Sequence, residues 1–207
     1  MVIDHPIFLE SIRFIRSRLI ANDLNYLEKK VLERLVHTSG DFSVQNLVNY
    51  SEGACANGLQ ALQNGAPILT DTDMAAAAIK SMAENTTRNK VFTARMWFGK
   101  NNHTNLSKTA YGLSEGWKEL SAKNSGSKSP IIVIGSSPTA LNYLIDILEN
   151  AKDLPSLIIG MPVGFIEVEN SKNKLISSNF PRIVLNSTRG GAAMAAAAVN
   201  ALLRETI

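Results

Sequence analysis

Cysteine is almost absent from this sequence, since Cys55 is the only one among 207 residues. A lone cysteine excludes an intramolecular disulfide, so a reducing compartment is the expected setting. Cys55 lies within the small-residue run Gly53–Ala56. That setting favours a buried apolar role over a nucleophilic one.

Long apolar runs are also missing. No stretch reaches the roughly 18 uncharged apolar residues that a membrane span needs. The segment Met1–Arg13 lacks the basic region and the long apolar core of a signal peptide. We therefore expect a cytoplasmic protein without a membrane partner.

Charge of one sign does not accumulate anywhere along the chain. The 21 Lys and Arg against 18 Asp and Glu give a net charge of +3, and the basic residues are spread out. This argues against a nucleic-acid partner, which requires a dense basic surface. The small surplus fits an anionic small molecule, or simply a solvated surface.

Histidine is scarce, and only three occur in the chain. His5 and His103 have no metal-ligand spacing to another His or to Cys, so no metal site is predicted. The sequence also lacks a full Gly-x-Gly-x-x-Gly motif and a phosphate-binding lysine loop. These absences argue against a nucleotide site.

The first forty residues, by contrast, carry a clear helical pattern. Apolar residues recur at helical spacing over Phe8–Leu19 and again over Leu24–Leu35, and Gly40 is suited to end the second helix. This places His37 at or just past a helix C-terminus.

From Ala66 onward, short β-branched runs alternate with helical segments, which predicts an α/β fold. Continuous apolar strands separated by helices are typical of a Rossmann-like, three-layer fold with a mostly parallel sheet covered on both faces. We predict a single domain over residues 1–207, with residues of about 1–40 packed as a helical segment on the α/β core. The predicted strands are Pro67–Thr70, Lys90–Met96, Ile131–Gly135, Leu157–Gly160 and Ile183–Leu185, and the predicted helices are Met74–Met82, Lys108–Leu120, Pro138–Leu148 and Gly190–Arg204.

Ligands of such sheets bind outside the carboxyl ends of the strands. Two loops there, Gly135–Pro138 and Thr188–Gly191, place small residues before a helix, where free backbone N–H groups can receive a carboxylate or a phosphate. Close packing of helix on sheet explains their glycines almost as well. Asp71 and Asp73 are expected to cap the helix that follows them.

His37 is the titratable residue best suited to proton transfer. Imidazole gains and loses a proton near neutral pH, and a helix C-terminus favours its protonated form. Thr38, Ser39 and Asp41 supply nearby groups that can fix its tautomer. The competing interpretation, which these residues alone favour, is a histidine that caps its own helix.

An ordered series of motifs carries a more specific signal. Taken together, it resembles the precorrin-8X methylmutase family, also called precorrin isomerases, over nearly the whole chain. The motifs are His5-Pro6-Ile7, Glu10-Ser11, Val36-His37-Thr38-Ser39-Gly40-Asp41, Gly65-Ala66-Pro67-Ile68, Thr70-Asp71-Thr72-Asp73-Met74, Ser107-Lys108-Thr109-Ala110, Pro138-Thr139-Ala140-Leu141, Gly160-Met161-Pro162-Val163-Gly164-Phe165, Glu169-Asn170-Ser171-Lys172, and Arg189-Gly190-Gly191 through Asn200-Ala201-Leu202.

The resemblance implies a homodimeric isomerase of cobalamin biosynthesis that needs no cofactor. Its reaction moves a methyl group from C11 to C12 of precorrin-8X or cobalt-precorrin-8, which gives hydrogenobyrinate or cobyrinate. His37 matches the family's catalytic histidine, which exchanges a proton with the macrocycle. The expected contacts to the anionic corrinoid substrate are Ser11, Thr38, Ser39, Asp71, Lys108, Thr109 and Arg189.

One motif departs from the family pattern: Ser107-Lys108-Thr109-Ala110 stands where many relatives have Thr-Arg-Ser-Ala. Lysine lacks the bidentate fork that arginine offers to a carboxylate. Two functions of other classes remain as alternatives. One is a corrinoid carrier that binds without turnover, and the other is an α/β protein that binds a nucleotide.

Overall fold

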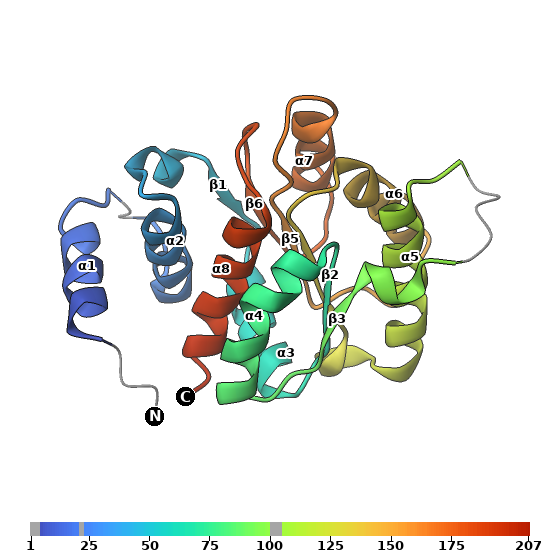
Figure 1. Ribbon diagram of the computed structural model, residues 1–207, viewed down its shortest axis with the longest axis horizontal. Coiled ribbons are helices and arrows are strands. Elements are labelled where there is room, and N and C mark those ends of the chain that lie inside the picture. Colours follow the sequence, from blue (N-terminus) through green and yellow to red (C-terminus); the bar gives the residue numbers. More distant parts are fainter. Residues whose placement is uncertain (1–4, 21–22, 100–104) are drawn as a thin grey trace.

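The computed structural model describes residues 5–20, 23–99 and 105–207 (Figure 1). Helices and strands alternate along most of this length, and short 3-10 helices at Phe42–Asn46, Ala94–Trp97 and Gly126–Lys128 join some of them. The elements in chain order are α1 (Pro6–Arg16), α2 (Tyr26–Ser39), β1 (Val48–Tyr50), α3 (Ala54–Gln63), β2 (Ile68–Thr70), α4 (Asp73–Asn85), β3 (Val91–Thr93), α5 (Lys108–Lys123), β4 (Ile131–Ile134), α6 (Pro138–Leu148), β5 (Leu157–Gly160), α7 (Val168–Ile176), β6 (Arg182–Leu185) and α8 (Ala192–Arg204).

The sheet has six strands in the order β1-β6-β5-β4-β2-β3. All neighbouring pairs are parallel except β1 with β6, which is antiparallel. The central strands β4 and β5 are buried along their whole length. Burial on both faces explains why they read as continuous apolar runs, and the predicted mostly parallel α/β fold is confirmed.

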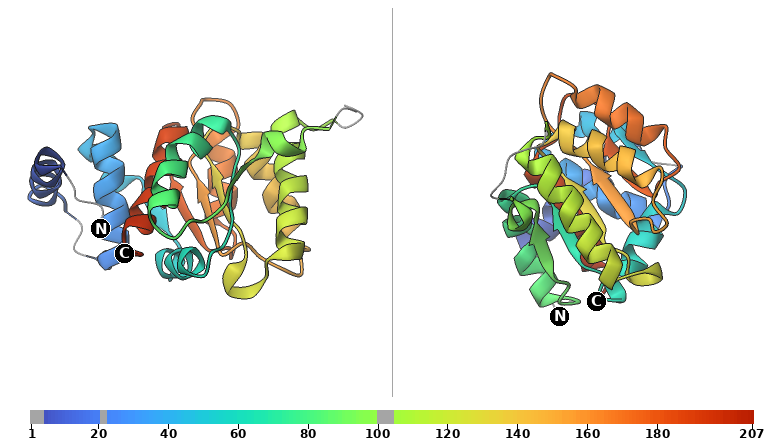
Figure 2. Two further views of the ribbon diagram at one scale, coloured as in Figure 1. Left: turned by 60° about the horizontal axis from the view of Figure 1, so that its bottom comes forward. Right: turned by 90° about the vertical axis from the view of Figure 1, so that its right-hand side faces the viewer.

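Helices cover both faces of this sheet. One face packs against α2, α3, α4 and α8, and the other packs against α5, α6 and α7. The two rotated views in Figure 2 show the sheet between these layers. Helix α1 packs on α2 at the outer end of the first layer, so the N-terminal helices join the same core cluster as the sheet.

Small residues let α8 approach the sheet closely. The helix is buried from Ala192 to Leu203 apart from its exposed second residue, Ala193. A Cβ on Gly135 would lie 2.7 Å from the backbone nitrogen of Ala192. The glycine in this strand-end loop is therefore explained by helix packing.

Several elements differ from the sequence prediction. Strand β1 and helices α3 and α7 were not predicted from the sequence. The second predicted strand, Lys90–Met96, is shortened to β3 because the chain turns into a 3-10 helix at Ala94. The N-cap of α4 is Thr72, whose hydroxyl accepts from the backbone N–H of Ala75, so neither Asp71 nor Asp73 caps this helix.

Cys55 is buried, as its small-residue setting predicted, and burial raises the pKa of its thiol to about 12. Across the described ranges, every helix is too short or too polar to cross a membrane.

Candidate functional site

His37 lies in the last turn of α2. A capping box between Asn25 and Glu28 starts this helix, and Gly40 ends it in the left-handed region with a φ of 65°. The imidazole is held by α1, because its Nδ1 lies 3.0 Å from the hydroxyl of Ser11. Phe8 packs edge-on against the same ring, with centroids 5.2 Å apart. The ring thus bonds to another helix and does not cap its own.

The surroundings of His37 favour the neutral imidazole. Burial lowers its pKa below the ordinary value of 6.5, and the positive charge of Arg34 lowers it further. This corrects the expectation that the helix C-terminus would favour the protonated form, because desolvation and a like charge outweigh the helix dipole here. A neutral imidazole with one nitrogen bonded to Ser11 leaves its other nitrogen, Nε2, for proton exchange.

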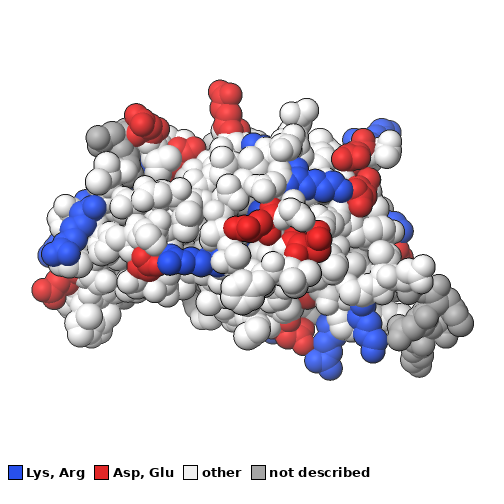
Figure 3. Space-filling model, turned by 90° about the horizontal axis from the view of Figure 1, so that it is seen from above, with Lys and Arg blue, Asp and Glu red and all other residues white. Residues whose placement is uncertain are grey.

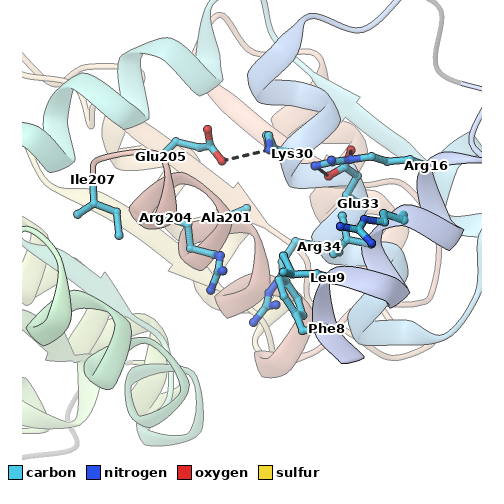
Figure 4. Close-up of a pocket in the computed structure, with 12 residues that line it drawn as sticks. Phe8, Leu9, Arg16, Lys30, Glu33, Arg34, Ala201, Arg204, Glu205 and Ile207 are labelled. Atoms are coloured by element: carbon cyan, nitrogen blue, oxygen red, sulfur yellow. Dashed lines mark hydrogen bonds and ion pairs between the residues drawn. The ribbon is translucent and has the colours of Figure 1, made fainter. Parts of the chain in front are cut away.

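A cavity of about 760 Å³ lies between α1, α2 and the end of α8 (Figure 4). This volume falls within the range of small-molecule sites, roughly 300–1,000 Å³. Five cationic side chains line it against two carboxylates. The lining residues are Phe8, Leu9, Ile12, Arg13, Arg16, Lys30, Glu33, Arg34, Ala201, Arg204, Glu205 and Ile207.

Phe8 connects this cavity with His37. The guanidinium groups of Arg34 and Arg204 lie 5.1 and 4.9 Å from the centroid of its ring, at cation–π distance. Figure 4 shows both side chains converging on Phe8 at one end of the cavity. The aromatic ring therefore holds two like charges near each other, beside the histidine.

Two ion pairs lie in the part of the cavity away from Phe8. Arg16 donates to both carboxylate oxygens of Glu33 at 2.6 and 2.8 Å, and the Lys30 ammonium lies 3.7 Å from Glu205. Glu33 is only 7% exposed, so its carboxylate serves mainly to hold Arg16 and with it α1.

A second, smaller cavity of about 280 Å³ lies beside the C-terminus of α2. Thr38, Ser39 and Asp41 line it from α2 and the following turn, and Arg189 lines it from the loop after β6. Arg189 forms an ion pair with Asp41 and donates to the Ser43 hydroxyl at 2.7 Å. Ser11, His37, Thr38, Ser39 and Arg189 are thus gathered around one helix end.

Asp71 lies elsewhere, in the loop after β2. It is 3% exposed, and one of its oxygens accepts the backbone N–H groups of Ser136 and Ser137 at 2.7 and 3.0 Å. Burial raises the pKa of this carboxyl, while those N–H groups oppose the rise. Asp71 therefore joins the strand-end loops of β2 and β4, and its contact with a substrate stays a prediction.

Lys108 and Thr109 belong to the same neighbourhood as Asp71. They open α5 just after its N-cap, Ser107, whose hydroxyl lies 3.1 Å from the hydroxyl of Thr139 in the first turn of α6. Lys108 is exposed. Over the described part of the chain, no hydrogen bond or ion pair joins this group to the residues around His37.

The other histidines have different places. The ring of His5 caps α1 by accepting from the backbone N–H of Ile7 at 3.3 Å. His103 lies outside the described residues.

The cationic cavity was not predicted from the sequence. Its charges come from three helices far apart in the chain, and no linear motif brings them together. One signal was available, because Lys30, Glu33, Arg34 and His37 repeat at the spacing that places residues on one face of a helix. That spacing marks one wall of the cavity, and only the fold supplies the others.

Comparison with known proteins decides the family. The sequence profile described as precorrin-8X methylmutase matches residues 6–205. The chain belongs to the precorrin-8X methylmutase family. It is an isomerase, and the family acts in cobalamin biosynthesis.

Individual relatives agree with this assignment. The precorrin-8X methylmutase of Pseudomonas aeruginosa is 35% identical over 86% of this chain and 84% of its own length. The cobalt-precorrin-8 methylmutase of Synechocystis is 29% identical over 97% and 95%. The solved structure of the precorrin-8X methylmutase from Thermus thermophilus superposes with a TM-score of 0.83 at 28% identity, over 97% of this chain and 95% of that one.

Proposed function

We propose that this methylmutase-family chain moves the methyl group from C11 to C12 of precorrin-8X or cobalt-precorrin-8, with His37 as proton donor and acceptor. The product is hydrogenobyrinate or cobyrinate. The observation that carries the proposal is the setting of His37, a neutral imidazole anchored at Nδ1 by Ser11 and packed against Phe8, which lines the larger cavity. An intramolecular shift needs a substrate held in one orientation and control of one proton.

The Ser11–His37 hydrogen bond suits a group that both gives and takes a proton. A serine hydroxyl can donate or accept. When Nε2 of neutral His37 has no proton, Ser11 accepts from Nδ1–H, and it still accepts from Nδ1–H after Nε2 has taken a proton from the macrocycle and the ring is an imidazolium that can give that proton back. The histidine can therefore present either form to the macrocycle without losing its anchor, 3.0 Å away.

The charges near His37 suit a substrate with several carboxylates. Arg13, Arg34 and Arg204 line the larger cavity, and Arg189 borders the smaller one. Arginine binds carboxylates with two parallel hydrogen bonds. We assign the acetate and propionate groups of the corrinoid to these guanidinium groups, while His37 faces the ring between them.

We further propose that the enzyme is a homodimer. Lys108 and Thr109 open a helix that packs on the opposite face of the sheet from α2, in a group separate from His37. A second copy can bring their counterparts to the histidine of the first. This accounts for one substrate site that uses both groups of predicted residues.

Exposed apolar side chains favour an interface at the carboxyl edge of the sheet. Phe165 and Ile166, in the loop after β5, are 89% and 81% exposed, and Met74 at the start of α4 is 68% exposed. The loops after β5 and β6 reach the top of Figure 1, and Figure 3 looks onto that side, where uncharged atoms predominate. Exposed apolar groups of this kind mark contact surfaces, and a two-fold dimer buries the same patch of both chains.

The test is conversion of the substrate, which changes the visible spectrum because the shift alters the conjugation of the macrocycle. Wild-type protein should convert precorrin-8X or its cobalt form, and His37→Gln should slow that conversion by about 100-fold or more, as expected for loss of a general acid–base group. His5→Gln is the matched control, because His5 caps α1 and should leave the rate nearly unchanged.

Three results would contradict the proposal. If wild-type protein leaves the spectra of precorrin-8X and of its cobalt form unchanged, the proposed reaction is wrong. If His37→Gln converts the substrate at the wild-type rate, the proposed role of His37 is wrong. A single-turnover experiment separates catalysis from the carrier alternative, since a carrier binds the corrinoid without converting one equivalent.

A further inference from the structure

Lys172, in the middle of α7, is a charged side chain with 0% exposure. Its ammonium donates to two backbone carbonyls, those of Ser187 and Arg189, each at 2.6 Å. Burial lowers its pKa to about 8, against a smaller opposing effect of Glu169. Burying an ammonium is costly unless its hydrogen bonds repay the lost water. These two bonds are therefore the main physical reason for a lysine at this position.

The two carbonyls flank Thr188 in the loop that follows β6. That loop is also bonded to the loop after β5: Gly164 donates to the carbonyl of Thr188 at 3.0 Å, and Gly191 donates to that of Met161 at 2.8 Å. A Cβ on Gly190 would lie 2.0 Å from the Met161 carbonyl oxygen, so the two loops touch through their backbones. Lys172 adds a clamp from α7 to these contacts.

The loop that Lys172 holds carries Arg189, whose side chain points the other way. The guanidinium contacts Asp41 and Ser43, just beyond the α2 terminus, and borders the cavity of Thr38 and Ser39. The backbone carbonyl of Arg189 is thus fixed by Lys172, while its side chain faces the proposed substrate site. Any shift of that carbonyl displaces the guanidinium.

We propose that Lys172 is a positioning residue, which sets the place of Arg189 beside the His37 helix and thereby the affinity for the carboxylates of the substrate. This inference rests on the proposed function. Lys172 does not touch the substrate and acts through the backbone of residues 187–189. Its loss should therefore weaken substrate binding and leave the methyl shift at His37 almost unchanged.

The experiment is a double-mutant cycle between Lys172→Met and Arg189→Ala, read out as KM and kcat for precorrin-8X. We expect about a tenfold rise in KM for each single variant, kcat within about twofold of wild type, and no further rise in the double variant, as for residues that act as one unit. Lys174→Met is the matched control on the same helix, because Lys174 is partly exposed and pairs with Asp146. It should behave as wild type.

Hydrogen exchange provides a readout that does not depend on turnover. Peptides covering residues 186–191 should exchange faster in Lys172→Met, while those of Arg189→Ala should keep wild-type protection. If wild-type protein fails to convert precorrin-8X, the proposed function fails, yet the exchange data still report whether Lys172 holds the loop. Exchange unchanged in Lys172→Met would overturn the clamp itself.

Other results would overturn the proposal directly. These are an unchanged KM in folded Lys172→Met, or KM effects that multiply fully in the double variant. If Lys172→Met does not fold, Lys172→Gln, which keeps N–H donors but removes the charge, replaces it in the cycle. Failure of both to fold would also overturn the proposal, since Lys172 would then be required for the fold itself.

Discussion

At the scale of single residues, the proposed proton exchange depends on keeping His37 uncharged at neutral pH. Burial is the larger cause of its lowered pKa and Arg34 the smaller one. Ser11 bonds to one nitrogen of the ring, and Phe8 packs nearly perpendicular to it. The histidine is thus ready to accept a proton over a wider acidic range than a free imidazole.

This environment predicts the pH dependence of the reaction. Because the folded pKa lies below 6.5, kcat/KM should fall only when the pH drops below that value and His37 becomes protonated. Arg34→Gln removes a like charge, so it should raise the pKa of His37 and move the acid limb of the profile to higher pH. The profile of kcat/KM and an NMR titration of the ring both measure this shift.

Lys29→Gln is the control for that experiment, since it removes one positive charge from the same helix two turns before His37. The acid limb of its profile should lie at the same pH as in wild type.

The lowered pKa of His37 also predicts how the stability of the fold depends on pH. Above pH 6.5, His37 is neutral in both the folded and the unfolded chain. As the pH falls from 6.5 toward the lower pKa of the folded state, stability is lost, because the unfolded chain binds the proton more readily. An acid limb that stays in place in Arg34→Gln would refute this account.

At the scale of elements, the sequence pattern predicted the helices and strands that form from their own residues, and it missed those that depend on contacts far along the chain. Strands β4 and β5 are short, continuous apolar runs, and α2 has a periodic apolar stripe with a glycine at its end, so the sequence alone indicated them. Strand β1 has three half-buried residues and exists because it pairs with β6 far along the chain. Helix α7 is rich in polar residues, and its buried Lys172 makes sense only once the loop it binds is in place.

The same distinction applies to the site. His37 and Ser11 could be predicted because a family motif carries each of them. Arg34 and Arg204 could not be assigned, since their common neighbour, Phe8, lies on a third helix. The convergence of charges from three helices is a property of packing, which a linear sequence does not display.

Helix α1 is the element whose docking controls the site, because it carries Phe8 and Ser11. Its ties to α2 include two apolar residues, Ile12 and Ile15, and the bidentate pair of Arg16 with Glu33. Arg16→Met should weaken this docking by about 1 kcal/mol, since Arg16 is half-exposed and the pair is partly screened. We expect faster hydrogen exchange over residues 6–16 and a lower kcat, with a smaller change in the exchange of α8.

Arg18→Met is the matched control for α1, because Arg18 stacks on Phe14 at 4.4 Å, away from Glu33. Its exchange and kcat should stay near wild type. Equal acceleration of exchange in α1 and α8 after Arg16→Met would mean that the pair stabilises the whole protein instead of docking one helix.

At the scale of the whole molecule, the predicted substrate residues fall into two groups. Ser11, His37 and Arg189 surround the end of α2, whereas Asp71 and Lys108 lie near the start of α5 and α6. A polycarboxylate macrocycle can contact both groups if two copies face each other. The homodimer proposed above therefore carries a geometric requirement, that His37 and Lys108 act in the same site from different chains.

Heterodimers test that requirement. In a heterodimer of one His37→Gln chain and one Lys108→Ala chain, purified through two affinity tags, one site would carry both substitutions and the other neither. At substrate concentrations well below the KM of Lys108→Ala, such a dimer should retain about half of the wild-type activity, although each parent is nearly inactive. If both residues served the same site from one chain, neither site would be intact and the heterodimer would be nearly inactive too.

The exposed apolar loop supplies the control for this experiment. Phe165→Asp places a charge on the proposed interface, where an unpaired buried carboxylate opposes association. When Phe165→Asp is the only substitution in the chain, light scattering should give the mass of one chain. This variant should also lose the activity that requires two chains. A Phe165→Asp monomer with full activity would show that one chain holds a complete site, and the division of the substrate residues between two chains would then be wrong.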